Sequence, residues 1–185
     1  AHGLSSNMVS SPNTHILAVM AGDGQMDPLD LPSLLEPIAT KQADYVKGNR
    51  FHSRHNMRLI PIPRRYGIQF FTWMTHIAAG IRPGQFQDAQ CGYTAANETF
   101  IKSLLTADIY PRYGFPNDVI LHAISNDFRL VETPVKAIYG AEVSGINPFK
   151  DVPKLLLRLL KQYLKQSFTL QYDHNKHNIF PAEKR

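Results

Sequence analysis

The spacing of apolar residues in the first part of the chain predicts two strands and a helix. Residues 15–20 form a continuous apolar run that ends in a polar Ala-Gly-Asp-Gly segment at 21–24. This pattern is typical of a buried strand that delivers a loop at its carboxyl end. Over 30–38 the apolar side chains recur every three or four residues, which predicts a short amphipathic helix. Residues 44–48 indicate a second strand.

The remainder of the chain continues this alternation. A helical period covers 68–78, and helices are also expected over 97–105, where Asn97 can cap the first turn, and over 119–124. Residues 128–138 have a mostly extended pattern. Because strands interleave with helices along the sequence, we predict an α/β fold.

Residues 151–170 carry the clearest helical period and predict a basic amphipathic helix. Its apolar side consists of Leu155, Leu156, Leu159, Leu160 and Tyr163, and its basic side of Lys154, Arg158, Lys161 and Lys165. Such a helix can lie in the interface of an anionic membrane, or it can pack on its own domain with a solvated cationic face. The pattern leaves both interpretations open. Polar segments at 1–14 and 171–185 form the two ends.

The composition indicates one globular domain with a preference for anionic partners. Of 185 residues, 43% are hydrophobic, and 20 Lys and Arg stand against 15 Asp and Glu, a formal charge of +5. No run reaches the ~18 uncharged apolar residues of a membrane-spanning helix, and the first residues lack the layout of a secretory signal. A single cysteine, Cys91, excludes an intramolecular disulfide and favours a reducing, cytoplasmic compartment.

Asp23 is the candidate metal ligand. An aspartate between two glycines just after a buried strand allows backbone and carboxylate to approach a metal-bound diphosphate closely. Mg²⁺ or Mn²⁺ would accept the Asp23 carboxylate and the Gln25 carbonyl, with water and phosphate oxygens in the remaining positions. The same spacing also fits an ordinary Asp-Gly turn, so that alternative stays open.

The segment 50–65 has no clear period but is rich in arginine. Its members are Arg50, Arg54, Arg58, Arg64 and Arg65. Guanidinium groups match phosphate oxygens bidentately, so several together can neutralise a diphosphate or a lipid phosphate. Aromatic side chains for base stacking are scarce among them, and we therefore expect no nucleic-acid partner. A solvated basic loop is the alternative interpretation.

Two aspartates are candidate general bases. Asp88 precedes a small, glycine-containing segment, Ala-Gln-Cys-Gly-Tyr at 89–93, and could act as a base or accept a hydrogen bond from a sugar hydroxyl. Asp118 lies at an expected helix start, where capping explains it equally well. Cys91 is not expected to be a nucleophile, since no His or Asn beside it in sequence would activate it.

Together these segments resemble the family 2 glycosyltransferases, particularly the branch of dolichyl-phosphate mannose synthases and bacterial polyprenyl-phosphate sugar transferases. The matching stretches are Val19-Met-Ala-Gly-Asp-Gly-Gln-Met-Asp-Pro28, Ala43-Asp-Tyr-Val-Lys-Gly-Asn-Arg50, Asp88-Ala-Gln-Cys-Gly-Tyr93, Tyr110-Pro-Arg-Tyr-Gly-Phe-Pro-Asn-Asp118, Arg129-Leu-Val-Glu-Thr-Pro-Val135 and Tyr139-Gly-Ala-Glu-Val-Ser-Gly-Ile146. The resemblance covers 15–150 and implies a GT-A-type mixed sheet flanked by helices, with the catalytic-domain portion incomplete at its N-terminus. Ala21 stands where the family's Asp-x-Asp metal motif has its first aspartate.

The resemblance implies an inverting, metal-dependent transfer of a sugar from a nucleotide-diphosphate sugar of the GDP-mannose or UDP-glucose type. The acceptor would be a polyprenyl or dolichyl phosphate, or a glycan, at the cytoplasmic face of a membrane that the 151–170 helix contacts. In this interpretation Asp23 and Gln25 hold the metal, and Gly24, Gln25 and Arg50 contact the donor diphosphate. The remaining arginines hold an acceptor phosphate, joined there by Arg50. A hydroxyl acceptor would need Asp88, or else Asp118, as base. The alternative is a non-catalytic fragment or pseudoenzyme that contacts a membrane or another protein.

Overall fold

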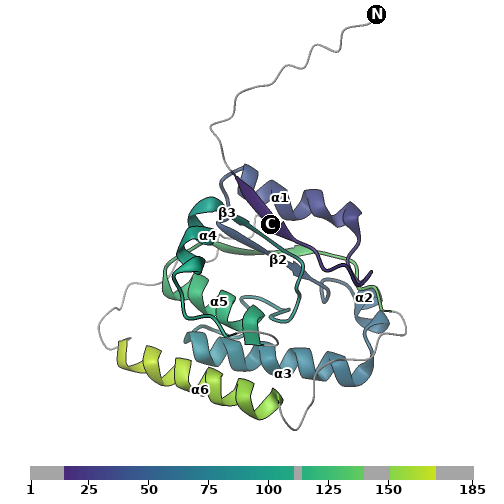
Figure 1. Cartoon of the computed structure of the whole chain (residues 1–185). Coiled ribbons are helices and arrows are strands. Elements are labelled where there is room, and N and C mark those ends of the chain that lie inside the picture. Colours follow the sequence, from purple (N-terminus) through teal and green to yellow (C-terminus); the bar gives the residue numbers. More distant parts are fainter. Residues whose placement is uncertain (1–14, 111–113, 140–150, 170–185) are drawn as a thin grey trace, which may run out of the picture.

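A four-stranded mixed sheet lies at the centre of the molecule. The computed structural model describes residues 15–110, 114–139 and 151–169 (Figure 1). The strands are β1 (Ile16–Val19), β2 (Tyr45–Asn49), β3 (Thr94–Asn97) and β4 (Leu130–Pro134), in the spatial order β1-β3-β2-β4. Strand β3 runs antiparallel to both of its neighbours, whereas β2 and β4 are parallel. The carboxyl ends of β2 and β4 therefore meet at the same edge of the sheet.

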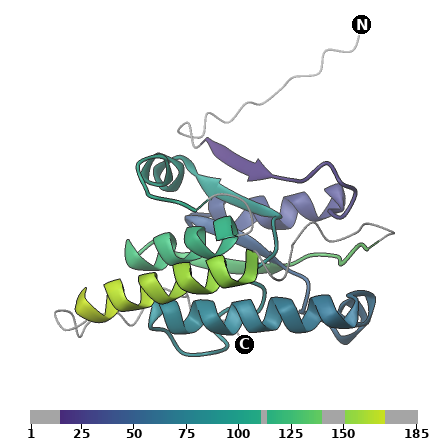
Figure 2. The same cartoon turned by 60° about the horizontal axis from the view of Figure 1, so that its bottom comes forward.

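Helices cover both faces of this sheet. They are the 3-10 turn η1 (Pro28–Asp30), α1 (Leu31–Ala39), α2 (Arg54–Leu59), α3 (Ile62–Ala79), α4 (Glu98–Leu105), α5 (Phe115–Ser125) and α6 (Asp151–Thr169). Helix α1 lies on one side of the sheet, while α3, α5 and α6 lie on the other, with α3 and α6 side by side in both views (Figures 1 and 2). The α/β class and the mixed sheet flanked by helices are thus confirmed.

Successive side chains of β2 pack into two different hydrophobic clusters, one on each face of the sheet. Tyr45 packs into the larger cluster, with Phe100 stacked on its ring at 4.9 Å. Val46 points the opposite way and packs against Leu34 and Ile38 of α1. Since successive strand side chains alternate between faces, the five buried residues of β2 are held on both sides, and the loop at its carboxyl end has a fixed starting point.

Most predicted elements are confirmed, and Asn97 caps α4 by accepting a hydrogen bond from the Phe100 N–H at 2.8 Å. The segment 50–65, which has no clear period in the sequence and for which a solvated loop was one interpretation, contains α2, and α3 begins at Ile62. The pattern concealed this helical start because the apolar side chains of its first turns face solvent rather than the core. Strand β3 was not predicted either.

Strand β1 departs from the expected buried strand. Leu17 and Val19 are 51% and 49% exposed, and within the described residues β1 is paired with β3 only. The apolar run at 15–20 reflects an edge strand whose exposed side chains are apolar. Residue period cannot reveal this, since it does not tell how many partners a strand has.

Helix α6 packs on the domain, as one of the two interpretations of its pattern predicted. Leu155 and Leu159 are buried in the larger cluster. The expected division of its faces was wrong in part, because Leu160 and Tyr163 are exposed, whereas Arg158 pairs with two aspartates instead of facing solvent. The segments 1–14 and 171–185, and the matching residues 111–113 and 140–146, lie outside the described residues.

Candidate active site

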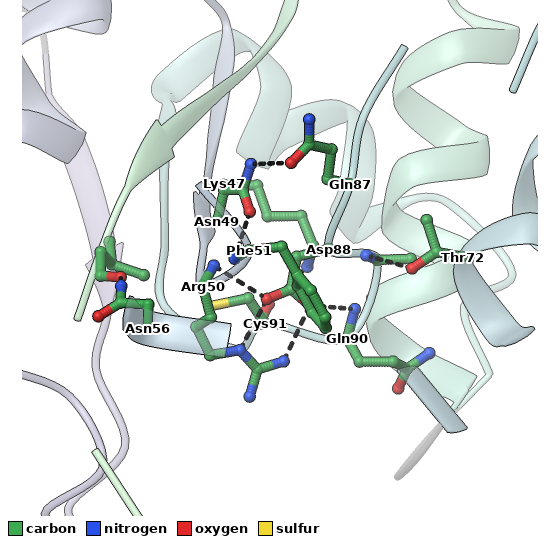
Figure 3. Close-up of polar contacts among 12 residues, drawn as sticks. Lys47, Asn49, Arg50, Phe51, Asn56, Thr72, Gln87, Asp88, Gln90 and Cys91 are labelled. Atoms are coloured by element: carbon green, nitrogen blue, oxygen red, sulfur yellow. Dashed lines mark hydrogen bonds and ion pairs between the residues drawn. The ribbon is translucent and has the colours of Figure 1, made fainter. Parts of the chain in front are cut away.

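The middle of β2 carries a buried lysine. Lys47 is 1% exposed, and its Nζ donates to the backbone carbonyl of Cys91 at 2.5 Å (Figure 3). Burial lowers the pKa of Lys47, and it raises the pKa of the Cys91 thiol. Gly48 is required here, since a Cβ would lie 2.9 Å from Val135 and 3.0 Å from the Cys91 sulfur. The strand end is therefore packed tightly against the 88–93 segment.

Arg50 and Asp88 form a bidentate pair at the centre of the site. Arg50 donates from Nε to Oδ2 of Asp88 at 2.7 Å and from Nη2 to Oδ1 at 2.8 Å, and its backbone N–H adds a third contact at 3.2 Å (Figure 3). Asp88 is fully buried. Burial acts to lower the pKa of Arg50, but the Asp88 charge and hydrogen bonds outweigh it and raise that pKa. Charged, bidentate pairs of this kind are rigid and directional.

Glu132 of β4 fixes the loop that carries Asp88. Its Oε2 accepts the Gln87 N–H and its Oε1 accepts the Asp88 N–H, both at 2.8 Å. Asn49 at the end of β2 donates to the same carboxylate at 3.0 Å. Burial is the main cause that raises the pKa of Glu132 to about 7, with the Asp88 charge acting in the same direction and the two backbone hydrogen bonds opposing. Two parallel strands thus clamp one loop.

Tyr139 connects the Arg50 pair to a second arginine. Arg50 donates from Nη1 to the Tyr139 hydroxyl at 2.9 Å, and the Arg64 guanidinium lies 5.0 Å from the centre of the Tyr139 ring. A guanidinium over an aromatic face is attracted by the ring's electron density. The structure therefore brings Arg50, Asp88 and Arg64 into one network.

The other candidate arginines are not part of that network. Arg54 and Arg58 are exposed on α2. Arg65 is half-buried on α3, and its Nε is buried without a hydrogen-bond partner. A buried donor that lacks a partner is costly, which makes Arg65 the arginine most in need of an acceptor.

The loop after β1 holds Asp23 in a turn. Oδ1 of Asp23 accepts the Gln25 N–H at 3.0 Å, and Gly24 adopts a positive φ of 75°. Across the described ranges, no group of three or more His, Cys, Asp or Glu side chains is placed to hold a metal ion. One carboxylate would fit Mg²⁺ if phosphate oxygens and waters completed the shell, which is how that ion is commonly bound.

Asp118, the second candidate base, does not share the partners of Asp88. It lies on α5, is 2% exposed, and accepts from the Tyr110 N–H and from Arg158 of α6. Its Oδ2 takes these contacts, whereas Oδ1 is buried without a partner. These contacts join α5 to α6.

Sequence reasoning missed Lys47, Asn49 and Tyr139 as members of the site and assigned no role to Glu132. A lysine at the centre of an expected strand, directly after the apolar Tyr45 and Val46, is a signal that could have drawn attention to Lys47. The other three are brought to Asp88 and Arg50 by the pairing of β2 with β4 and by the chain that follows β4, which no local pattern encodes.

Comparison with known proteins relates the chain to glycosyltransferases. No protein-family model matches it. It is similar to a UDP-N-acetylglucosamine–dolichyl-phosphate N-acetylglucosaminyltransferase of Methanococcus voltae, with 25% identity over 124 residues, which are 67% of this chain and 48% of the relative. Two uncharacterized proteins of Methanocaldococcus jannaschii are 24% and 30% identical over 77% and 80% of this chain and 60% of each relative.

Among solved structures, the chain aligns with glucosyl-3-phosphoglycerate synthase of Mycobacterium tuberculosis, in complex with phosphoglyceric acid. The TM-score is 0.46 at 16% identity, over 82% of this chain and 49% of the other.

The resemblance to family 2 glycosyltransferases is confirmed by the sequence relationship to the transferase of M. voltae. This chain spans between about half and 60% of the length of the curated relatives it matches.

Proposed function

We propose that residues 15–150 are part of the catalytic domain of an inverting glycosyltransferase. It would move a sugar from a nucleotide-diphosphate sugar to a lipid phosphate, with dolichyl or another polyprenyl phosphate as the acceptor class. The motif order and the relationship to a transferase whose name includes dolichyl phosphate support the class. The donor would be of the GDP-mannose or UDP-glucose type, and the same relative adds UDP-N-acetylglucosamine to the donors worth testing.

The observation that carries the choice of acceptor is the bidentate pairing of Asp88. Both of its oxygens accept from Arg50, so this carboxylate is poorly placed to take a proton from an attacking hydroxyl. Asp118, the other candidate base, is buried and held by Arg158. A phosphate monoester has a second pKa near ~6 and is already ionised at neutral pH. A phosphate acceptor therefore needs no base, which favours it over a glycan hydroxyl.

The chain's own residues would act by binding and orienting. Arg64 and Arg65, at the start of α3, would hold the acceptor phosphate, and the exposed Arg54 and Arg58 would attract it. Arg50 is fixed by Asp88 and Tyr139. Its second N–H group on each Nη atom would donate to the donor diphosphate, which Gly24 would also contact. Preorganised charge of this kind stabilises a leaving group without reorganising during the reaction. Asp23 and Gln25 would hold Mg²⁺ or Mn²⁺, which would neutralise charge on the departing diphosphate.

A transfer assay tests this function. The full chain is incubated with a radiolabelled UDP- or GDP-sugar, Mn²⁺ and either a polyprenyl phosphate or an oligosaccharide. We expect label in the lipid phosphate and none in the oligosaccharide. Arg64→Gln should lower transfer at least tenfold, whereas Lys102→Gln, which removes an exposed charge paired with Glu98 on α4, should leave it unchanged. Label in the oligosaccharide alone would contradict the phosphate acceptor.

A non-catalytic protein of the same fold is the second candidate. Ala21 at the first position of the metal motif favours it, because one carboxylate of the pair is absent. In that case no donor would give transfer to either acceptor, while the folded chain would still bind its membrane or protein partner.

A further inference from the structure

Helix α3 carries a row of large apolar side chains on its solvent-facing side. Ile62, Tyr66, Phe70 and Trp73 are 63%, 68%, 42% and 50% exposed. Spacings of four, four and three residues place them on one face of the helix. The opposite face is buried in the protein core, through residues such as Phe71 and Ala78. We call the four exposed side chains the α3 stripe.

The chemistry of the stripe is that of a membrane interface. Tyr and Trp combine an apolar ring with a polar group, and both are enriched where hydrocarbon meets water. The Phe70 and Trp73 rings lie 6.5 Å apart, so the aromatic surface is continuous at this end of the helix. Leu59 of α2, three residues before Ile62 in the chain, is a further exposed apolar side chain. A contiguous apolar surface on a folded domain marks an interaction site.

Positive charge accompanies this apolar row. Arg54 and Arg58 are exposed on α2, which directly precedes α3. Arg64 and Arg65 lie in the first turns of α3 but are half-buried, and Arg64 lies over the Tyr139 ring. The chain as a whole has a formal charge of +5. Apolar and aromatic side chains beside a group of arginines complement a surface that is both hydrocarbon-rich and negatively charged.

We infer that the α3 stripe and the arginines of α2 form a docking surface for an anionic lipid bilayer. The stripe would enter the boundary between headgroups and acyl chains, to a depth of ~5–10 Å, and the arginines would contact lipid headgroups. This surface differs from the one expected on the 151–170 helix. It requires no spanning segment, and along the stretches of chain that the structure covers no helix is long and apolar enough to cross a membrane.

A hollow lies beside this surface and reaches the residue that precedes Asp88. A cavity of about 410 Å³ is lined by Trp73, Met57, Phe51, Phe86 and Gln87, among other residues. Gln87 directly precedes Asp88 and is held by Glu132. A lipid that leaves the bilayer beside Trp73 would therefore find a partly aromatic hollow whose lining extends to Gln87, the residue before Asp88. Entry of a lipid into this hollow rests on the proposed function, whereas membrane docking of the α3 stripe does not.

Trp73 is the only tryptophan of the sequence, so its fluorescence reports on the stripe directly. The full chain is titrated with vesicles of phosphatidylcholine alone and with vesicles that contain phosphatidylglycerol as well. We expect a blue shift of the emission with the anionic vesicles, reduced by added salt. Lipids brominated near the headgroup should quench the emission more strongly than lipids brominated near the end of the acyl chain.

Variants separate this surface from the rival on α6. Tyr66→Ser with Phe70→Ser should lower vesicle binding at least tenfold, and Arg54→Gln with Arg58→Gln should lower it for anionic vesicles only. Leu157→Ser with Leu160→Ser removes two exposed side chains of α6 and should leave binding unchanged. Circular dichroism checks that each variant is folded.

Three results would overturn the inference. The first is an emission spectrum that does not change with either type of vesicle. The second is loss of vesicle binding in the α6 variant but not in the α3 variant. The third is a stable dimer on sizing in which Trp73 is already protected from acrylamide without lipid, because a second copy would then cover the stripe. Failure of sugar transfer alone would affect only the proposed function, since vesicle binding is measured without donor.

Discussion

At the scale of single residues, the site depends on charged and polar side chains that are buried together with a hydrogen-bonding partner. Buried charges are tolerated when their partners satisfy them, and Arg50 with Asp88 meets that condition through two side-chain contacts. Both residues could be selected from the sequence as candidates, because each lies in a recognisable motif. Their mutual pairing could not, since it depends on the packing of segments 38 residues apart.

The raised pKa of Glu132 leads us to predict that the stability of the protein depends on pH. Its pKa in the folded protein is about 7, raised from 4.5 chiefly by burial, so between these values the folded protein binds more protons than the unfolded chain. Stability from this group is therefore present at low pH and is lost as pH rises through 7. Compared with Glu132→Gln, the wild type should lose up to about 3 kcal/mol of unfolding free energy between pH 4 and pH 8.

Urea denaturation at several pH values measures this difference. Glu36→Gln serves as the control for removing a carboxylate, because Glu36 is exposed on α1 and a surface substitution of this kind should change the unfolding free energy by no more than about 0.5 kcal/mol. A constant difference between the wild type and Glu132→Gln at every pH would show that Glu132 does not titrate in this range.

At the scale of elements, the sequence patterns succeeded where a helix or strand buries one regular face. Helix α1 is an example, strand β2 was recognised although it is buried on both faces, and the cap of α4 follows from Asn97 alone. The patterns failed where exposed positions are apolar. Strand β1 was predicted to be buried and the start of α3 was missed. The reason is that residue type does not distinguish an apolar side chain in the core from an apolar side chain that is exposed.

Two adjacent leucines test how α6 is held. Leu159 is fully buried in the larger cluster, whereas Leu160 is 50% exposed. Leu159→Ala should therefore cost about 2–5 kcal/mol of unfolding free energy, and Leu160→Ala about 0.5 kcal/mol or less. Denaturant unfolding of both variants measures the contrast. Equal losses would mean that α6 does not dock as described.

At the scale of the whole molecule, the α/β class and the order of the motifs were predictable, but the way they converge was not. Lys47 and Asn49 come from β2 and Arg50 directly follows it, Asp88 comes from a loop before β3, and Glu132 comes from the parallel strand β4. Parallel strands bring their carboxyl ends to one edge, which is where such sheets place ligands. The metal-binding role of Asp23 stays a prediction, because it requires phosphate oxygens of the donor as further ligands of the metal ion.

Calorimetric titration of the full chain with UDP and GDP, each with and without Mn²⁺, tests the central claim that this fold holds a donor diphosphate. We expect Mn²⁺-dependent binding of one nucleotide that is lost in Asp23→Asn and kept in Glu36→Gln, which removes a comparable exposed carboxylate. Absence of binding to either nucleotide, from wild-type protein shown to be folded, would contradict the claim and favour the non-catalytic alternative.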